Sequence, residues 1–159
     1  MKPTNSMPLK TNVAGRNMID GVLVTPLKRI PHPKGDILHA LKASEFGFFG
    51  IGEIYFSSIL KNERKGWKKH SKMILNLVVP VGSIRFVIFD DRPDSLSRGE
   101  FFELTVNKEN YCRLTVPSGV WFAFEGEGME LNLLLNIANI EHDPNEVQNM
   151  ELNEIDYDW

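Results

Sequence analysis

The fold class is decided by residues 65–95, KGWKKHSKMILNLVVPVGSIRFVIFDDRPDS, and residues 104–124, LTVNKENYCRLTVPSGVWFAF. Short apolar runs alternate here with turns rich in Pro, Gly, Asn and Asp, which lie at 80–83, 90–95, 107–110 and 117–119. Strands of about four to eight residues joined by such turns are typical of an antiparallel sandwich or barrel. A helical bundle needs longer segments with a period of about 3.6 residues, and none is present. The sequence therefore predicts an all-β jelly roll with little helix.

The same pattern continues on both sides of this block. We expect strands over 21–27, 53–60, 74–81, 83–90, 101–106, 112–116, 120–124 and 130–140. Two prolines and a glycine predict a loop over 29–36, and the apolar spacing after it allows a short helix over 37–49. The strand over 83–90 is apolar on both faces, which predicts that a second layer or a partner chain covers each face.

Composition narrows the function classes. The chain has 159 residues, enough for one domain, and its formal net charge of −3 gives no reason to expect a nucleic-acid partner. The single cysteine, Cys112, excludes an intramolecular disulfide and a cysteine-cluster zinc site. The first residues lack the apolar core of a signal peptide, and no run approaches the roughly 20 apolar residues of a membrane helix. We therefore expect a cytoplasmic protein with no membrane partner.

Five segments resemble, in the same order, the dTDP-4-dehydrorhamnose 3,5-epimerase family and its sugar-isomerase relatives in the cupin superfamily. They are KGWKKH at 65–70, the strand–Gly82–strand–DRPDS block at 78–99, LTVNKEN at 104–110, VPSGVWFAF at 116–124 and EIDYDW at 154–159. The resemblance covers about residues 21–159. It implies a single cupin domain at 19–159 with an acidic C-terminal tail. Residues 1–18 are polar, with two prolines and no periodicity, which predicts a flexible N-terminal arm or a strand that orders only on a partner.

The resemblance also implies a chemistry. It points to a homodimer that epimerises a dTDP-4-keto-6-deoxyhexose without metal or cofactor, in polysaccharide biosynthesis such as that of lipopolysaccharide O-antigen. In such a site a histidine, oriented by a carboxylate, removes the proton next to the ketone, and a tyrosine returns a proton. The motif KGWKKH leaves two registers open, with either Lys68 or His70 at the base position. Both side chains should point to the same side of a strand, and we favour His70 because imidazole titrates near neutrality.

Other site residues follow from the same resemblance. Counting back from the terminal tryptophan makes Glu151 the orienting carboxylate, and Tyr55 and Tyr111 are the candidate tyrosines. Phe122 stands where the family has a histidine, which favours an altered, more apolar pocket. We expect substrate contacts from Lys34, Lys65, Trp67, Lys72, Arg85 and Trp121, with the lysines binding phosphate as point charges and Trp67 stacking on a base or sugar.

A metal site is not expected. A metal-holding cupin needs about four ligands, and the sequence supplies only His70 at a matching position.

Three functional alternatives stay open at this stage. The altered base motif is compatible with a 3,5-epimerase, with a sugar 3,4-ketoisomerase, or with a module that binds a nucleotide sugar without turnover. Label exchange from deuterated water would separate these alternatives.

Overall fold

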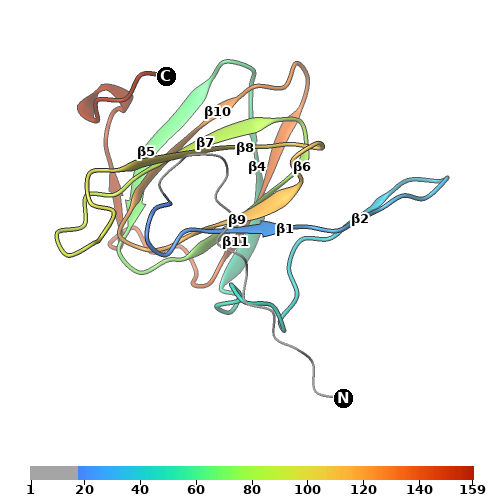
Figure 1. Cartoon of the computed structure of the whole chain (residues 1–159), viewed down its shortest axis with the longest axis horizontal. Helices are drawn as coiled ribbons and strands as arrows, with labels where there is room; N and C mark the ends of the chain where they lie inside the picture. The colour runs from blue at the N-terminus through green and yellow to red at the C-terminus, as the bar shows by residue number, and fades with distance from the viewer. Residues whose placement is uncertain (1–17) are drawn as a thin grey trace.

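The computed structural model describes residues 18–159, which form two five-stranded antiparallel sheets packed face to face (Figure 1). The first, named the β4 sheet, has the order β1 (Leu23–Pro26), β9 (Cys112–Val116), β6 (Leu75–Val81), β11 (Asn132–Ala138) and β4 (Glu53–Ile59). The second, named the β5 sheet, has the order β12 (Val147–Asn149), β5 (Arg64–His70), β10 (Trp121–Gly126), β7 (Ile84–Phe89) and β8 (Phe101–Val106). The predicted all-β jelly roll is confirmed.

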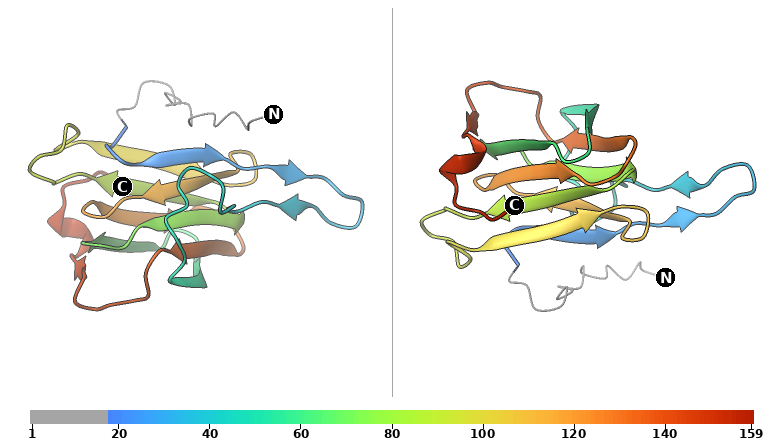
Figure 2. Two further views of the ribbon diagram at one scale, coloured as in Figure 1. Left: turned by 90° about the horizontal axis from the view of Figure 1, so that it is seen from below. Right: turned by 90° about the horizontal axis from the view of Figure 1, so that it is seen from above.

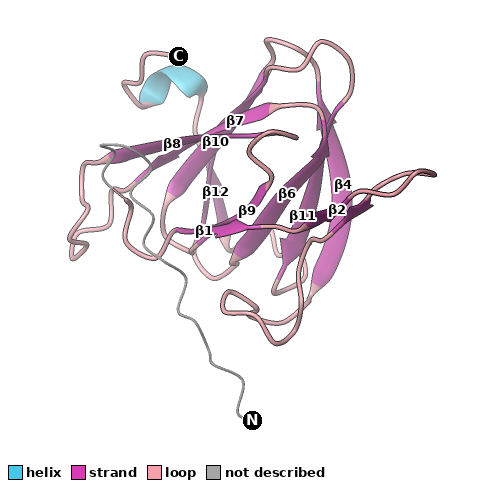
Figure 3. Ribbon diagram, turned by 45° about the vertical axis from the view of Figure 1, so that its right-hand side comes forward, coloured by secondary structure: helices cyan, strands magenta, loops and turns pink. Residues whose placement is uncertain are grey.

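Two further elements lie outside the sandwich. The hairpin of β2 (Arg29–Ile30) and β3 (Ile37–Leu38) extends away from one end of the body (Figure 2). The short 3-10 helix η1 (Leu152–Glu154) lies in the C-terminal segment, outside the β5 sheet (Figure 3). Among the described residues, no helix is long and apolar enough to cross a membrane. The predicted arm at 1–18 falls outside the described residues except for Met18, which packs against the core.

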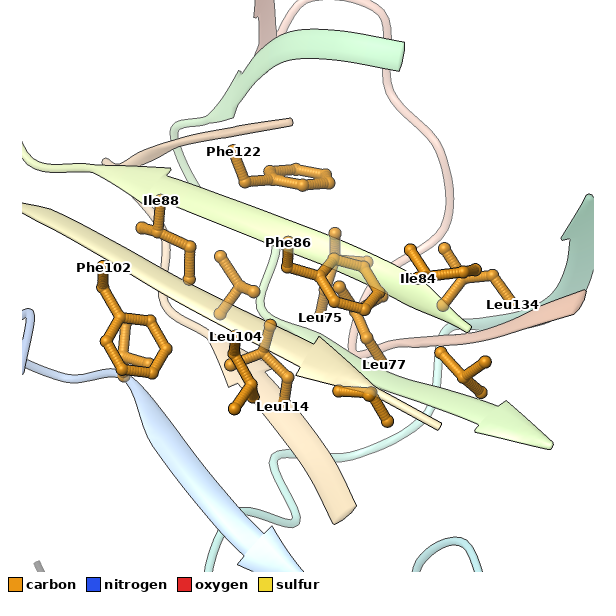
Figure 4. Close-up of a cluster of buried hydrophobic side chains, with 14 of the residues drawn as sticks. Leu75, Leu77, Ile84, Phe86, Ile88, Phe102, Leu104, Leu114, Phe122 and Leu134 are labelled. Atoms are coloured by element: carbon orange, nitrogen blue, oxygen red, sulfur yellow. The ribbon is translucent and has the colours of Figure 1, made fainter. Parts of the chain in front are cut away.

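The main core lies between the two sheets. Side chains from β6, β7, β8 and β9 point toward one another there, and the fully buried members include Leu77, Ile84 and Leu114 (Figure 4). A second cluster lies on the outer face of the β5 sheet, where the C-terminal segment covers Trp67, Val87, Trp121 and Ala123. The expectation that residues 83–90 are covered on both faces is confirmed, because β7 contributes side chains to both clusters.

The short helix allowed over 37–49 is absent. Its first residues form β3, and the rest form turns that lie on the outer face of the β4 sheet. Arg113 causes this conformation, since its buried guanidinium donates to the carbonyl of Ala40 at 2.9 Å and pairs with Glu45 at 2.7 Å. Asn76 Nδ2 donates to the carbonyl of Gly47 at 2.8 Å. These contacts hold the segment in turns against the sheet in place of a helix.

Candidate active site

A cavity of about 410 Å³ opens between the sheets at the end where β4 and β5 lie. Residues of both sheets and of the C-terminal segment line it: Tyr55, Ser57, Lys65, Gly66, Trp67, Lys68, His70, Leu75, Phe122, Phe124, Asn136, Asn149, Met150 and Glu151. The main core ends at Leu75 and Phe122, so polar groups of β4, β5 and β11 face a hollow rather than packed side chains. Concave sites with an apolar wall and a few convergent polar groups are typical ligand pockets.

Gly66 lets β5 bend along this cavity. Its φ of +132° lies in the region that favours glycine, and a Cβ there would lie 2.5 Å from the Cβ of Ala123. The register between β5 and β10 shifts at this point, between the pairs Phe122–Lys68 and Phe124–Lys65. After the shift, Lys68 and His70 lie on the cavity side of β5, as their spacing predicted.

His70 forms a buried pair with Glu146. Imidazole Nδ1 contacts Oε1 of Glu146, and the two residues are 7% and 4% exposed. The other carboxylate oxygen accepts hydrogen bonds from the amides of Lys72 at 3.0 Å and Met73 at 3.1 Å. Because both oxygens are held, Glu146 fixes the orientation of the imidazole ring. The carboxylate that orients His70 is therefore Glu146 and not the predicted Glu151, which borders the cavity without contacting His70.

The protonation of this pair follows from the hydrogen bonds. Burial raises the pKa of Glu146, but the hydrogen bonds from His70 and from the Lys72 and Met73 amides outweigh it and hold that pKa below its ordinary value. An ionised carboxylate only accepts hydrogen bonds, so Nδ1 of His70 carries the proton that it shares with Glu146. In the neutral ring, Nε2 then holds the lone pair. Within residues 18–159, Nε2 has no hydrogen-bond partner.

The rest of the cavity wall shapes the surroundings of His70. Phe122 stacks on its ring at a centroid distance of 6.2 Å and an interplanar angle of 22°. From the β4 sheet, Tyr55 lines the opposite wall, and burial, followed by the charge of Glu53, raises the pKa of its hydroxyl. Tyr55 is paired in register with Asn136, whose Nδ2 donates to Ser57 Oγ at 3.2 Å. A protonated phenol from one sheet and an imidazole from the other thus line the same cavity.

Two lysines belong to the cavity, as predicted. Lys65 Nζ donates to the carbonyl of Ser58 at 2.7 Å, which ties it to the end of β4. Lys68 is exposed to the cavity and, among the described residues, forms no ion pair or hydrogen bond through its side chain. The other candidate tyrosine, Tyr111, lies elsewhere, with its hydroxyl donating to the carbonyl of His39 at 2.8 Å.

The aromatic and arginine contacts predicted for substrate lie on the opposite face of the β5 sheet. Trp67 borders the cavity, but its ring is fully buried among Tyr157 and Trp159, with Nε1 directed at the carbonyl of Leu152. Trp121 Nε1 donates to Asp91 at 2.8 Å, and Arg85 pairs with Glu125. The C-terminal segment occupies the face on which these side chains lie, and their contact with substrate stays a prediction.

The two remaining predicted lysines also lie away from the cavity wall. Lys72 lies in the turn after β5, where its backbone amide, rather than its ammonium group, contributes by binding Glu146. Lys34 lies at the tip of the β2–β3 hairpin and does not line this cavity. Among the described residues, no group of three or more His, Cys, Asp or Glu side chains is placed to hold a metal ion.

Comparisons with known proteins agree with this geometry. No protein-family model matches the chain. The crystal structure of a dTDP sugar isomerase from Desulfovibrio desulfuricans G20 shares 34% identity over 84% of this chain and 85% of that chain, with a TM-score of 0.81.

Two curated proteins are also similar. A probable low-salt glycan biosynthesis epimerase of Haloferax volcanii is 31% identical over 83 residues, which is 52% of this chain and 53% of that protein, so the match spans about half of each. The spore coat polysaccharide biosynthesis protein SpsL of Bacillus subtilis is 23% identical over 81% of this chain and 85% of that protein. Together with the jelly roll and the cavity, these likenesses confirm that the chain belongs to the dTDP-4-dehydrorhamnose 3,5-epimerase-like family of cupin-type dTDP-sugar epimerases and isomerases.

Proposed function

We propose that this protein is an isomerase that moves a proton next to the ketone of a dTDP-linked 4-keto-6-deoxyhexose, in the manner of a 3,5-epimerase. The observation that carries the proposal is the His70–Glu146 pair in the wall of the cavity. The relatives named above support a place in polysaccharide biosynthesis, of which lipopolysaccharide is one example. A cytoplasmic location stays a prediction of the sequence.

The residues suit an epimerisation through an enolate. Nε2 of His70 accepts the proton from the carbon next to the ketone, and the electron pair of the broken C–H bond moves onto the ketone oxygen. Glu146 stabilises the imidazolium that forms, since its carboxylate contacts Nδ1. Tyr55, on the opposite wall, donates its hydroxyl proton to the other face of the same carbon, which inverts the centre. The ketone itself acidifies the C–H bond, so this chemistry needs no cofactor.

A second candidate reaction uses the same base. If the hydroxyl proton on carbon 3 moves to the enolate oxygen on carbon 4, and His70 returns its proton to carbon 4 on the same face, the ketone migrates to carbon 3 and the enzyme is a 3,4-ketoisomerase. Phe122 replaces the family histidine and stacks on the imidazole ring, so in this reaction His70 would both remove and return the proton. The third alternative is a nucleotide-sugar-binding cupin without turnover.

One experiment separates the three alternatives. Purified protein is incubated with dTDP-4-keto-6-deoxyglucose in deuterated water, and the sugar is followed by proton NMR. We expect deuterium at carbon 3 or 5 with inversion, and loss of the exchange in His70→Asn with retention of dTDP binding. Migration of the ketone would identify a ketoisomerase, and binding without exchange would identify a binding module. Exchange that survives in His70→Asn would show that another group is the base.

We also propose that the protein is a homodimer. The β2–β3 hairpin extends away from the body (Figure 2), and an isolated two-stranded hairpin is at best marginally stable in water. In addition, large apolar side chains are exposed on the outer side of β4 and on the loop before it: Phe46, Phe49, Ile51, Ile54 and Phe56. A second copy that covers this patch would also support the hairpin.

The oligomeric state tests this part of the proposal. Sedimentation equilibrium should show a dimer at micromolar concentration, and Phe56→Asp should shift it toward monomer because a carboxylate would be buried in the contact. The side chain at 56 points away from the cavity, since its neighbours Tyr55 and Ser57 line it. A wild-type protein that is monomeric throughout would overturn the proposed dimer.

A further inference from the structure

We infer that Phe122 decides which carbon of the sugar His70 deprotonates. Its ring holds the methyl group of the 6-deoxy sugar beside the imidazole, so that the proton leaves carbon 5 and carbon 3 keeps its configuration. The product is then a 4-keto sugar inverted at carbon 5 alone. This inference rests on the proposed function, since it concerns the same cavity and the same proton transfer.

Carbons 3 and 5 react alike but carry different groups. Both adjoin the ketone at carbon 4, so loss of a proton from either one gives an enolate on the same oxygen. Carbon 3 carries a hydroxyl group, whereas carbon 5 carries a methyl group. When either carbon lies over Nε2 of His70, the group that it carries lies beside the imidazole ring. The surroundings of that ring therefore decide which carbon fits.

The side chains next to the imidazole are apolar. Phe122 stacks on the ring of His70, with 6.2 Å between the ring centroids, and is only 7% exposed. Leu75 and Phe124 add further apolar surface to the cavity. A methyl group against these side chains leaves water at a gain in free energy. A hydroxyl group in the same place would lose its hydrogen bonds to water without a replacement.

Polar groups face the sugar from the β4 sheet. Ser57 and Asn136 line the cavity, and Asn136 Nδ2 donates to Ser57 Oγ at 3.2 Å. Among the described residues, neither the hydroxyl hydrogen of Ser57 nor Oδ1 of Asn136 has a hydrogen-bond partner. The pair thus offers one donor and one acceptor to the hydroxyl groups of a sugar.

The two orientations of the sugar match these walls differently. Packed sheets lie about 10 Å apart, so a sugar ring between them contacts both. With carbon 5 at His70, the methyl group lies on Phe122 and the hydroxyl groups can bind Ser57 and Asn136. With carbon 3 at His70, a hydroxyl group lies on Phe122 without a partner. The first orientation leaves fewer buried polar groups unpaired, which favours reaction at carbon 5.

The carbon that exchanges in the wild type is the first test. The protein is incubated with dTDP-4-keto-6-deoxyglucose in deuterated water, beside a sample without protein. Deuterium at carbon 5 removes the coupling of the methyl protons, so their NMR doublet becomes a singlet, whereas deuterium at carbon 3 removes the signal of its own proton. We expect exchange at carbon 5 to be at least about tenfold faster than at carbon 3.

Substitution of Phe122 tests whether its ring is the cause. Phe122→Asn places a polar group beside the imidazole and should lower the ratio of carbon 5 to carbon 3 exchange by about tenfold. Phe122→Leu is the matched control, since it keeps the wall apolar, and should leave the ratio within about threefold of the wild type. With the wild type, the corresponding dTDP-linked 4-keto sugar that carries a hydroxyl group at carbon 6 should react with a kcat/KM about 10- to 100-fold lower. Calorimetry with dTDP reports the folding of each variant.

The outcomes distinguish this inference from the proposed function. Exchange in the wild type at carbon 3, or at both carbons equally, would overturn the role of Phe122 and leave the proposed function intact. An unchanged ratio in folded Phe122→Asn would overturn it as well, because another group would then select carbon 5. If Phe122→Asn does not fold, the two substrates decide with the wild type, and equal kcat/KM values would overturn the inference. Absence of exchange at either carbon in the wild type would overturn both.

Discussion

The two faces of strand β5 carry the same kinds of residue and use them differently. On the inner face, Lys68 and His70 border a cavity. On the outer face, Trp67 is fully buried under the C-terminal segment, and Lys69 binds Asp91 and lies 4.6 Å from the centre of the Trp121 ring. A basic, aromatic motif in a sequence therefore says little about a binding site until the face of each residue is known.

One segment, residues 146–159, serves both faces. It begins with Glu146 on the inner side, continues as β12 beside β5, and ends on the outer side with Trp159. Guanidinium groups of Arg64 and Arg85 lie 5.1 and 5.6 Å from the centre of the Trp159 ring, and the hydroxyl of Tyr157 contacts Glu103. Packing on the closed face thus holds in place the carboxylate that orients the base on the open face.

The largest expected effect on stability comes from the closed face. Trp67→Ala should lower the free energy of unfolding by about 3–5 kcal/mol, because it empties a fully buried site. Lys68→Ala, one residue away on the open face, should change it by less than about 0.5 kcal/mol. Urea denaturation measures both values. Equal effects of the two substitutions would contradict the assignment of the faces.

The largest expected effect on activity comes from the open face. Glu146→Gln should lower kcat by about 10²- to 10⁴-fold, because an amide can present its N–H₂ group to Nδ1 and favour the wrong tautomer of His70. Glu151→Gln is the matched control, since Glu151 borders the cavity but does not contact His70, and should cost less than about tenfold. Steady-state kinetics would reverse our assignment if Glu151→Gln proved the more damaging change.

A smaller effect should follow from loosening the connection between the faces. Trp159→Ala should destabilise the protein by about 1–3 kcal/mol and speed hydrogen exchange of the β12 amides, because it removes the last aromatic contact of the segment. Tyr157→Phe keeps the ring and removes only the hydroxyl that contacts Glu103, so it should cost less than about 1.5 kcal/mol. Exchange at β12 that does not change in Trp159→Ala would show that the tail does not hold this strand.

Local sequence patterns were enough to predict most of the strands of the fold. The Pro-x-Gly turn at 80–82 and the apolar runs around it predicted strands over 74–81 and 83–90, and the structure has β6 at Leu75–Val81 and β7 at Ile84–Phe89. Alternation along β5 placed residues 68 and 70 on one side correctly. The error over 37–49 arose because Arg113, far along the chain, holds Ala40 and Glu45 in turns against the sheet, a contact that local spacing does not show.

The site was harder to predict because its contacts are distant in sequence. Glu146 reaches His70 across 76 positions, and counting back from the terminal tryptophan selected Glu151 instead. The count fails because β12 lies between the two glutamates, so Glu151 falls beyond the strand that begins beside His70. Trp67 was expected at the substrate because the spacing shows only that it shares a face of the strand with Lys69. The C-terminal segment, which packs on Trp67, shows that this face is the outer one.

The smallest expected effect is a change in stability at low pH. It is measured on two buried carboxylates, one from each face of the sheet. Burial raises the pKa values of Glu146 and Glu125, yet hydrogen bonds from His70 and backbone amides to the first, and from Arg85 and Arg64 to the second, bring both below the ordinary value of 4.5. A group with a lower pKa in the folded state stabilises the protein above its unfolded pKa, and that stabilisation is lost as the pH falls through the folded value. The stability lost in Glu146→Gln and in Glu125→Gln should therefore be present at about pH 6 and shrink below about pH 4.5.

Urea midpoints across this range measure both variants, and kinetics at about pH 7 separates them. Glu146→Gln should lose activity together with stability, since its carboxylate acts on His70, whereas Glu125→Gln should lose stability alone, because Arg85 and Arg64 lie on the closed face. If the stability difference of either variant grew as the pH fell, its carboxyl group would have a raised rather than a lowered pKa in the folded protein. Loss of kcat in Glu125→Gln at full folding would show that the closed face acts on the reaction more directly than through the position of β12.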